Sequence, residues 1–137
     1  MVKVSKNTLS VLLLAASVGS AVAPAPAAAE PGGAPHAGHA GPYGMSSLEA
    51  LWEQAGGSPS TAVNAACHGM QESSGNRDAS SPNPDGGVNY GLWQLDTRGV
   101  GAGYTPVQLQ DPLTNARITV MATRNGTDWS HWATPGC

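Results

Sequence analysis

The sequence predicts a small, mainly α-helical domain that contains at most one short β-hairpin. Residues 46–57, 58–73 and 105–126 support this, because each segment opens on a Ser or Thr that can cap a helix and is closed by glycine nearby. Residues 88–96, VNYGLWQLD, are predicted to form a short strand or a buried turn. The chain of 137 residues shows no internal repeat, so one folded domain is expected.

The first helix is predicted from the segment SSLEALWEQAGG. Ser46 and Glu49 have the spacing of a capping box, and Gly56-Gly57 would stop the helix. Apolar residues recur here with the spacing of one buried helix face. That face is expected to contain Leu48, Leu51, Trp52 and Ala55.

The second helix is predicted to begin at Ser58-Pro59, an N-cap followed by proline at the first helical position, and to run to about Ser73. Its surface is rich in Ala and Gly, which would let neighbouring helices approach closely. The inward stripe is expected to contain Val63, Ala66, Cys67 and Met70.

The remaining segments are shorter. Residues 76–87, NRDASSPNPDGG, are expected to be loop, since Asx residues, prolines and glycines leave no periodic stretch. Two further helix starts are predicted at Thr105-Pro106 and Asp111-Pro112, and the second of these helices is expected to end at Asn125-Gly126. Residues 125–127 also match a glycosylation sequon, but we interpret them as the helix stop. Its inner face is expected to contain Leu113, Ala116, Val120 and Met121.

The N-terminal residues have the pattern of an export signal. A basic start is followed by an apolar run over residues 11–23 and by small residues at 27–29. We expect a signal peptide over residues 1–29, with Ala23 as the other cleavage site. An uncleaved membrane anchor is the alternative, but the apolar run is too short to span a bilayer and no basic flank follows it. Residues 30–44 are expected to be a flexible Pro/Gly/Ala-rich lead-in to a domain over residues 45–137.

Charge and composition exclude several partners. Removal of residues 1–29 would take both lysines and change the formal charge from −3 to −5, with four arginines left. No basic patch is available for nucleic acid or an anionic membrane surface. His36 and His39 lie in the flexible lead-in, where two histidines make a weak metal site at best, so we expect no metal. We also expect no cofactor and a monomeric protein.

Two cysteines in an exported chain predict one disulfide, Cys67 to Cys137. Two free thiols are the alternative. A cysteine protease built on Cys67-His68 is not expected, because adjacent helix residues face different directions and could not pair as nucleophile and base.

Glu72 is the candidate catalytic acid. It lies near the end of the second predicted helix, off the apolar stripe, in the small and polar stretch MQESSGN. The alternative without a catalytic role is that Glu72 is an exposed carboxylate paired with His68. Further along, NYGLWQLD gathers rings, glycine and amides, and such a composition suits sugars: rings cover pyranose faces, amides bind hydroxyl and acetamido groups, and a carboxyl donates a proton.

Two blocks carry a resemblance to a known family. E-S-S-G-N at 72–76 followed by G-L-W-Q at 91–94 resembles the lytic transglycosylase (SLT) and goose-type lysozyme-like superfamily. The tail NGTDWSHW is similar to small secreted actinobacterial members, and the pairing of an early cysteine with one after a terminal Trp resembles resuscitation-promoting factors. The resemblance covers about Leu48 to Cys137.

The resemblance implies a small lysozyme-like helical fold that acts on peptidoglycan glycan strands, outside the cell and at the cell wall. Glu72 would be the general acid at the bond between N-acetylmuramic acid (MurNAc) and N-acetylglucosamine (GlcNAc), and then the base that activates the MurNAc C6 hydroxyl. Trp93 is expected either to flank a sugar or to lie in the core. The substrate-binding residues implied are Ser73, Asn76, Tyr90, Gly91, Trp93 and Gln94.

The sequence departs from the family pattern in two places. Larger transglycosylases carry an A-Y-N motif whose tyrosine binds the glutamate, whereas this chain has ATRNG; Tyr90 or Tyr104 would have to substitute. Cys67 also lies five positions before the glutamate instead of next to it. A positive charge beside Glu72 would lower the pKa of its carboxyl and oppose protonation, so we expect His68 to be turned away or neutral.

A second carboxylate would be required by a retaining or inverting hydrolase, and Asp85 and Asp96 are the candidates, although turn chemistry explains each more simply. The leading hypothesis is therefore a secreted lytic transglycosylase that uses one Glu. The alternatives are a hydrolytic lysozyme of the same fold and a non-catalytic cell-wall sugar-binding protein.

Overall fold

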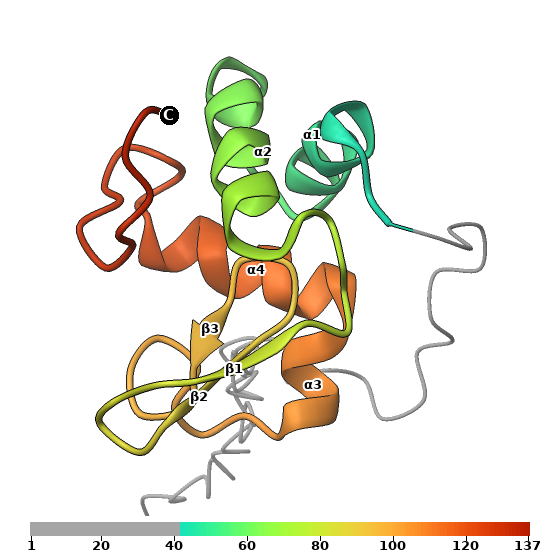
Figure 1. The fold of residues 1–137 in the computed structure, drawn as a ribbon. Coiled ribbons are helices and arrows are strands. Elements are labelled where there is room, and N and C mark those ends of the chain that lie inside the picture. The colour runs from blue at the N-terminus through green and yellow to red at the C-terminus, as the bar shows by residue number, and fades with distance from the viewer. Residues whose placement is uncertain (1–41) are drawn as a thin grey trace, which may run out of the picture.

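The computed structural model describes residues 42–137, and helices dominate it, as predicted (Figure 1). The expected signal peptide, most of the lead-in, and His36 and His39 lie outside the described residues. None of the helices in the described part has the length and apolar character that crossing a membrane would require. The elements are α1 (Met45–Gln54), α2 (Pro59–Ser73), β1 (Ser80–Pro82), β2 (Val88–Tyr90), β3 (Leu95–Asp96), α3 (Pro106–Gln110) and α4 (Pro112–Ala122).

Helix α1 begins two residues earlier than the sequence suggested, since the N-cap is residue 44 and not residue 46. Gly44 is its N-cap and provides no side-chain hydrogen bond, so Ser46 lies inside the first turn and the predicted capping box is wrong. The predicted stop is confirmed, because Gly56 takes a left-handed backbone with φ of 93°. The predicted inward residues Leu48, Leu51 and Trp52 are buried, as expected.

Helix α2 has the predicted start and end but a different buried face. Ser58 caps it by accepting a hydrogen bond from the Ser60 amide. Val63, expected inside, is 61% exposed, so that part of the prediction is wrong. The buried face is made of small residues because neighbouring side chains lie close to the helix backbone. A Cβ on Gly69 would lie 3.2 Å from both Leu48 Cδ1 and Trp93 Cε2. Buried α2 residues are Ala62, Ala65, Ala66, His68 and Gly69.

A three-stranded antiparallel sheet in the order β1-β2-β3 lies below α2 and α4 in the view of Figure 1. Ser80 pairs with Tyr90, and Asn89 pairs with Asp96. The prediction of an unbroken loop over 76–87 is wrong at Ser80–Pro82. This edge strand has no apolar alternation to reveal it, and Pro82 is tolerated at an edge because its missing N–H is not needed by a second neighbour.

Helices α3 and α4 start at the predicted residues. The Thr105 side chain and that of Gln108 form a reciprocal capping box, and Asp111 caps α4 by accepting from the Thr114 amide. Met121 is 64% exposed, so its predicted inward position is wrong. Ala116 is buried as predicted, and Ile118 joins it. Polar residues complete the buried face of the helix and its C-cap: Thr114, Asn115, Thr119 and Thr123.

The hydroxyls on α4 can be buried because they bond back to the helix. Thr119 Oγ1 donates to the Asn115 carbonyl at 2.8 Å, and Thr123 Oγ1 donates to the Thr119 carbonyl at 2.7 Å. Among the described residues, no buried side-chain nitrogen or oxygen lacks a hydrogen-bond partner. A polar face can therefore pack in the core without the cost of unpaired groups.

The fully buried Asn115 side chain joins three segments. Its Oδ1 accepts from the Trp93 amide at 3.0 Å, and its Nδ2 donates to the carbonyls of Tyr90 at 3.0 Å and Leu109 at 2.7 Å. Gly91 passes so close that a Cβ there would lie 2.3 Å from Asn115 Nδ2. Asn115 thus fixes the turn between β2 and β3 against α3 and α4.

The folded domain begins before residue 45. Tyr43, expected in the flexible lead-in, is 6% exposed and its amide donates to the Gly75 carbonyl at 2.8 Å. A Cβ on Gly75 would lie 1.9 Å from the Tyr43 carbonyl oxygen. The lead-in boundary at residue 44 is therefore too late, because Tyr43 packs against the turn that follows α2.

Asn115→Ala is expected to lower the free energy of unfolding by about 3 kcal/mol or more, because it leaves one buried amide and two carbonyls without partners. Urea denaturation followed by circular dichroism measures this. Asn76→Ala, which removes an exposed side chain that caps only the Asp78 amide, should cost about 1 kcal/mol or less. Equal losses in the two variants would contradict the role assigned to Asn115.

Candidate active site

A cavity of about 400 Å³ lies between the C-terminal end of α2, the sheet and the C-terminal segment, which we define as residues 127–137. It brings together the two residues on which the sequence prediction depended most, Glu72 and Gln94. Its size is within the range of small-molecule sites. The lining residues are Glu72, Asn83, Asn89, Gln94, Leu95, Asp96, Gly99, Val100, His131, Trp132 and Ala133.

Glu72 lies in the last turn of α2, and the residues after it end the helix sharply. Ser74 takes a left-handed backbone with φ of 53°, and its amide donates to the Met70 carbonyl. Ser73 Oγ donates to the Gly69 carbonyl at 3.1 Å and accepts from the Gly75 amide at 3.2 Å. The chain therefore turns away directly after Glu72, which leaves its side chain at the cavity.

Burial raises the pKa of Glu72 above its ordinary value. Among the described residues that line the cavity none is Lys or Arg, and His131 is the one side chain there that can become positive. The described residues contain one ion pair, Arg77 Nε to Asp78 at 3.9 Å, and Glu72 takes no part in it. The carboxyl is thus placed to hold a proton more readily than an exposed glutamate.

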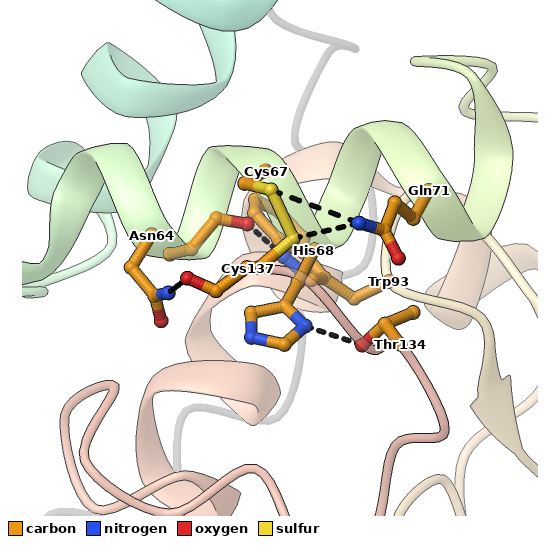
Figure 2. The surroundings of a disulfide bond; sticks show 8 residues. Asn64, Cys67, His68, Gln71, Trp93, Thr134 and Cys137 are labelled. Carbon is orange, nitrogen blue, oxygen red and sulfur yellow. Dashed lines mark hydrogen bonds between the residues drawn. A yellow bond between two sulfur atoms is a disulfide. The ribbon is translucent and has the colours of Figure 1, made fainter.

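His68 does not act as a charged neighbour of Glu72. Its ring stacks on Trp129 with centroids 3.8 Å apart, and its Nδ1 is hydrogen-bonded to Thr134 Oγ1 (Figure 2). Burial lowers the pKa of His68, which favours the neutral imidazole near pH 7. This agrees with the expected neutral His68 and argues against the alternative of a Glu72–His68 ion pair.

Gln94 lines the cavity, but most of its side-chain hydrogen-bonding capacity is used by other residues of the protein. Its Nε2 donates to the carbonyls of Ala79 at 3.1 Å and Gly91 at 3.0 Å, and its Oε1 accepts from Ser81 Oγ at 2.7 Å. Since both amide hydrogens are used, it can offer a ligand only one remaining lone pair on Oε1. Its backbone has φ of 48°, a sparsely populated conformation for a non-glycine residue.

Three other predicted binding residues have structural roles. Trp93 is fully buried and donates from Nε1 to the Ala65 carbonyl at 2.9 Å, so the core alternative holds and its predicted contact with a sugar is wrong. Gly91 provides the close approach to Asn115, and Tyr90 packs partly against the core. None of the three is among the residues that line the cavity.

Ser73 and Asn76 also do not line the cavity. Ser73 closes the end of α2, and Asn76 Oδ1 accepts from the Asp78 amide at 3.0 Å in the turn that follows. Both residues therefore support the turn beside Glu72, and neither of these two predicted binding residues lines the cavity.

A tyrosine that could replace the missing A-Y-N tyrosine is not found at the cavity. Tyr90 does not line it, and Tyr104 lines a separate pocket with Arg117 and Ile118. The geometry therefore offers neither of the two proposed substitutes to Glu72. Within the described residues no cluster of His, Cys, Asp or Glu could hold a metal ion.

The two candidate second carboxylates both serve turns, as predicted. Asp85 Oδ1 accepts from the Gly87 amide at 2.7 Å, and Asp96 Oδ1 accepts from the Arg98 amide at 3.0 Å. Asp96 differs from Asp85 because it also lines the Glu72 cavity. Asp96 is thus the one other carboxylate that the described lining contains.

The C-terminal wall of the cavity was not predicted from the sequence. Trp132 lines it, with Nε1 donating to the Trp93 carbonyl at 2.8 Å and its ring edge-on to Trp129 at 5.2 Å. Asn83, in the turn after β1, and Asn89, on β2, add side-chain amides, and Asn83 Nδ2 donates to Asn89 Oδ1 at 3.0 Å. The signal was present in NGTDWSHW, but no periodicity in that segment related it to Glu72.

The model of a family described as "Lysozyme like domain" matches residues 49–134. This range covers more than half of the chain and contains every residue that lines the cavity. No curated protein matches the sequence.

Glu72→Gln is expected to stabilise the protein near pH 7. With its pKa raised, Glu72 ionises at a cost in the folded state, and this cost appears as the pH rises above the ordinary carboxyl range. Below that range Glu72 is protonated and resembles Gln, so the difference in Tm should vanish. Calorimetric scans from acid to neutral pH measure it. Glu53→Gln, an exposed change on α1, should show no such pH-dependent gain, and a Glu72→Gln variant less stable at pH 7 would contradict the account.

Proposed function

Because the chain belongs to the lysozyme-like domain family, we propose that it is a peptidoglycan lytic transglycosylase in which Glu72 is the general acid and base. The observation that carries the proposal is the half-buried Glu72 carboxyl at the cavity, with its pKa raised by burial. Membership in the family supports a peptidoglycan-cleaving glycosidase in general. The choice of transglycosylase and of Glu72 is argued from the site.

In the first step, protonated Glu72 donates its proton to the oxygen between MurNAc and GlcNAc. The glycosidic bond breaks, GlcNAc leaves with the hydroxyl, and positive charge develops at the MurNAc anomeric carbon. A general acid is most useful when its pKa lies near the working pH, and the desolvation of Glu72 moves its pKa in that direction.

In the second step, the ionised Glu72 takes the proton of the MurNAc C6 hydroxyl. That oxygen then bonds to the anomeric carbon and closes a 1,6-anhydro ring, so Glu72 regains its proton and no water is consumed. One carboxyl is sufficient for these two steps. The proposal is supported by the commitment of Asp96 to the turn after β3, where its Oδ1 accepts from the Arg98 amide.

The hydrolytic lysozyme remains a second candidate for one reason. Asp96 lines the same cavity as Glu72, and an inverting enzyme needs a second carboxylate to activate water. The two mechanisms differ in their dependence on Asp96 and in the product end. They also differ in whether oxygen from water enters the product.

The polar lining is compatible with a neutral glycan. Asn83 and Asn89 contribute side-chain amides to the lining, and Trp132 contributes an aromatic ring from the C-terminal segment. Such groups suit hydroxyl and acetamido substituents and the apolar face of a pyranose. We place the enzyme outside the cytoplasm at the cell wall, a proposal that rests on the export pattern of residues 1–29 and on the location of the substrate.

The test is cleavage of purified glycan strands, with the products identified by mass spectrometry in ¹⁸O-labelled water. The wild-type protein should release 1,6-anhydro-MurNAc ends without ¹⁸O. Glu72→Gln should lower the rate by about 100-fold or more, as loss of a general acid does. Asp96→Asn should still form anhydro ends.

Glu53→Gln is the matched control and should cleave like the wild type, because Glu53 is exposed on α1. Reducing ends that carry ¹⁸O, lost in Asp96→Asn, would establish the hydrolase. Binding without cleavage would establish the sugar-binding protein. Equal rates for Glu72→Gln and wild type would remove Glu72 from the mechanism.

A further inference from the structure

The C-terminal segment returns from the end of α4 and runs beside α2 (Figure 1). It carries no helix or strand. Its first residues are held by backbone bonds, since the amides of Thr127 and Asp128 donate to the Thr123 carbonyl and that of Trp132 to the Trp129 carbonyl. For residues 133–137 no backbone–backbone hydrogen bond is found in the described structure. Other contacts must therefore hold the end of the segment.

Those contacts come from one face of α2 (Figure 2). Cys67 forms the disulfide with Cys137, which confirms the predicted pairing. Asn64 Nδ2 donates to the Cys137 carbonyl at 2.6 Å, and Gln71 Nε2 donates to Cys137 Sγ at 3.0 Å. His68 contacts Thr134. The α2 residues are spaced i, i+3, i+4 and i+7, so they form one continuous stripe.

This stripe adjoins the proposed acid. Glu72 directly follows Gln71 and lies one turn after His68 on α2. The helix that presents the carboxyl therefore also holds the segment that lines the cavity with His131, Trp132 and Ala133. The tether between α2 and the segment therefore joins the two sides of the cavity.

We propose that the C-terminal segment is a tethered wall of the glycan site, in which the Trp132 ring contacts a sugar and the Cys67–Cys137 disulfide holds that ring in its binding position. The inference rests on the proposed function, because it names the surface that would bind the same glycan. Trp132 suits this task, since it lines the cavity while its Nε1 is bonded to the Trp93 carbonyl. A partly buried ring whose N–H is already paired offers its apolar face at little cost in side-chain freedom.

A consequence is that glycan binding depends on oxidation. Cys137 is exposed and Cys67 is partly exposed, so a reductant can reach the disulfide in the folded protein. After reduction, the last residues keep only side-chain contacts with α2. Residues 133–137 are then free to move, and Trp132 keeps only its own bonds to the Trp93 and Trp129 carbonyls, while α2, packed on α1, keeps Glu72 in place.

The test measures binding separately from cleavage. In the Glu72→Gln background, the affinity for purified glycan strands is compared with and without Cys67→Ser/Cys137→Ser, and with Trp132→Leu. Each change should weaken binding about tenfold, and Trp132→Phe should recover part of the loss because it keeps an aromatic face. Val63→Ser, an exposed change on α2, is the matched control and should bind like its parent.

Kinetics on the active enzyme distinguish the wall from a purely structural tether. Loss of a binding surface raises KM and largely spares kcat, whereas partial unfolding lowers the amount of active enzyme and leaves KM unchanged. Circular dichroism at the assay temperature checks that each variant is folded. Unchanged affinity and KM in folded disulfide and Trp132→Leu variants would overturn the inference.

Failure of the proposed function has a different signature. If the wild type binds strands but cleaves none, the enzymatic assignment fails while the affinities still test the wall. If the Glu72→Gln parent binds no strands, the substrate class itself is wrong, and the wall falls with it.

Discussion

The buried amide of Asn115 is the interaction on which the site depends most. It satisfies the amide of Trp93 and the carbonyls of Tyr90 and Leu109, and so locks the turn between β2 and β3 against two helices. The residue after Trp93 is Gln94, whose side chain then ties β1 to that turn. The sheet side of the cavity thus rests on one side chain that never reaches the cavity.

Helix α2 supports the opposite side by carrying two kinds of residue on neighbouring faces. One face is small, and Gly69 lets Leu48 and Trp93 pack tightly against the helix, which holds it rigidly in the core. The other carries the tether to the C-terminal segment and ends at Glu72. A rigid helix is a precise support for the proposed acid, and Gln94, whose backbone is strained, lines the same cavity from the turn before β3.

Local chemistry made part of this structure predictable. Helix starts at Ser58, Thr105 and Asp111 were correct because a cap and a following proline act within a few residues. The disulfide followed from the presence of just two cysteines in the sequence. Burial was less predictable. Val63 and Met121 were expected inside because they are large and apolar, whereas the buried positions are filled by small residues and by residues whose polar groups bond within the helix, which allows close packing.

The proposed acid was found from a motif and the wall of its cavity was not, because Trp132 reaches the site through the path of a segment without periodicity. In the proposed mechanism Glu72 begins the reaction protonated. Carbon-13 NMR titration of the Glu72 carboxyl, assigned by its loss in Glu72→Gln, tests it most directly. The account predicts titration above the ordinary range for glutamate; titration at or below that range would contradict it.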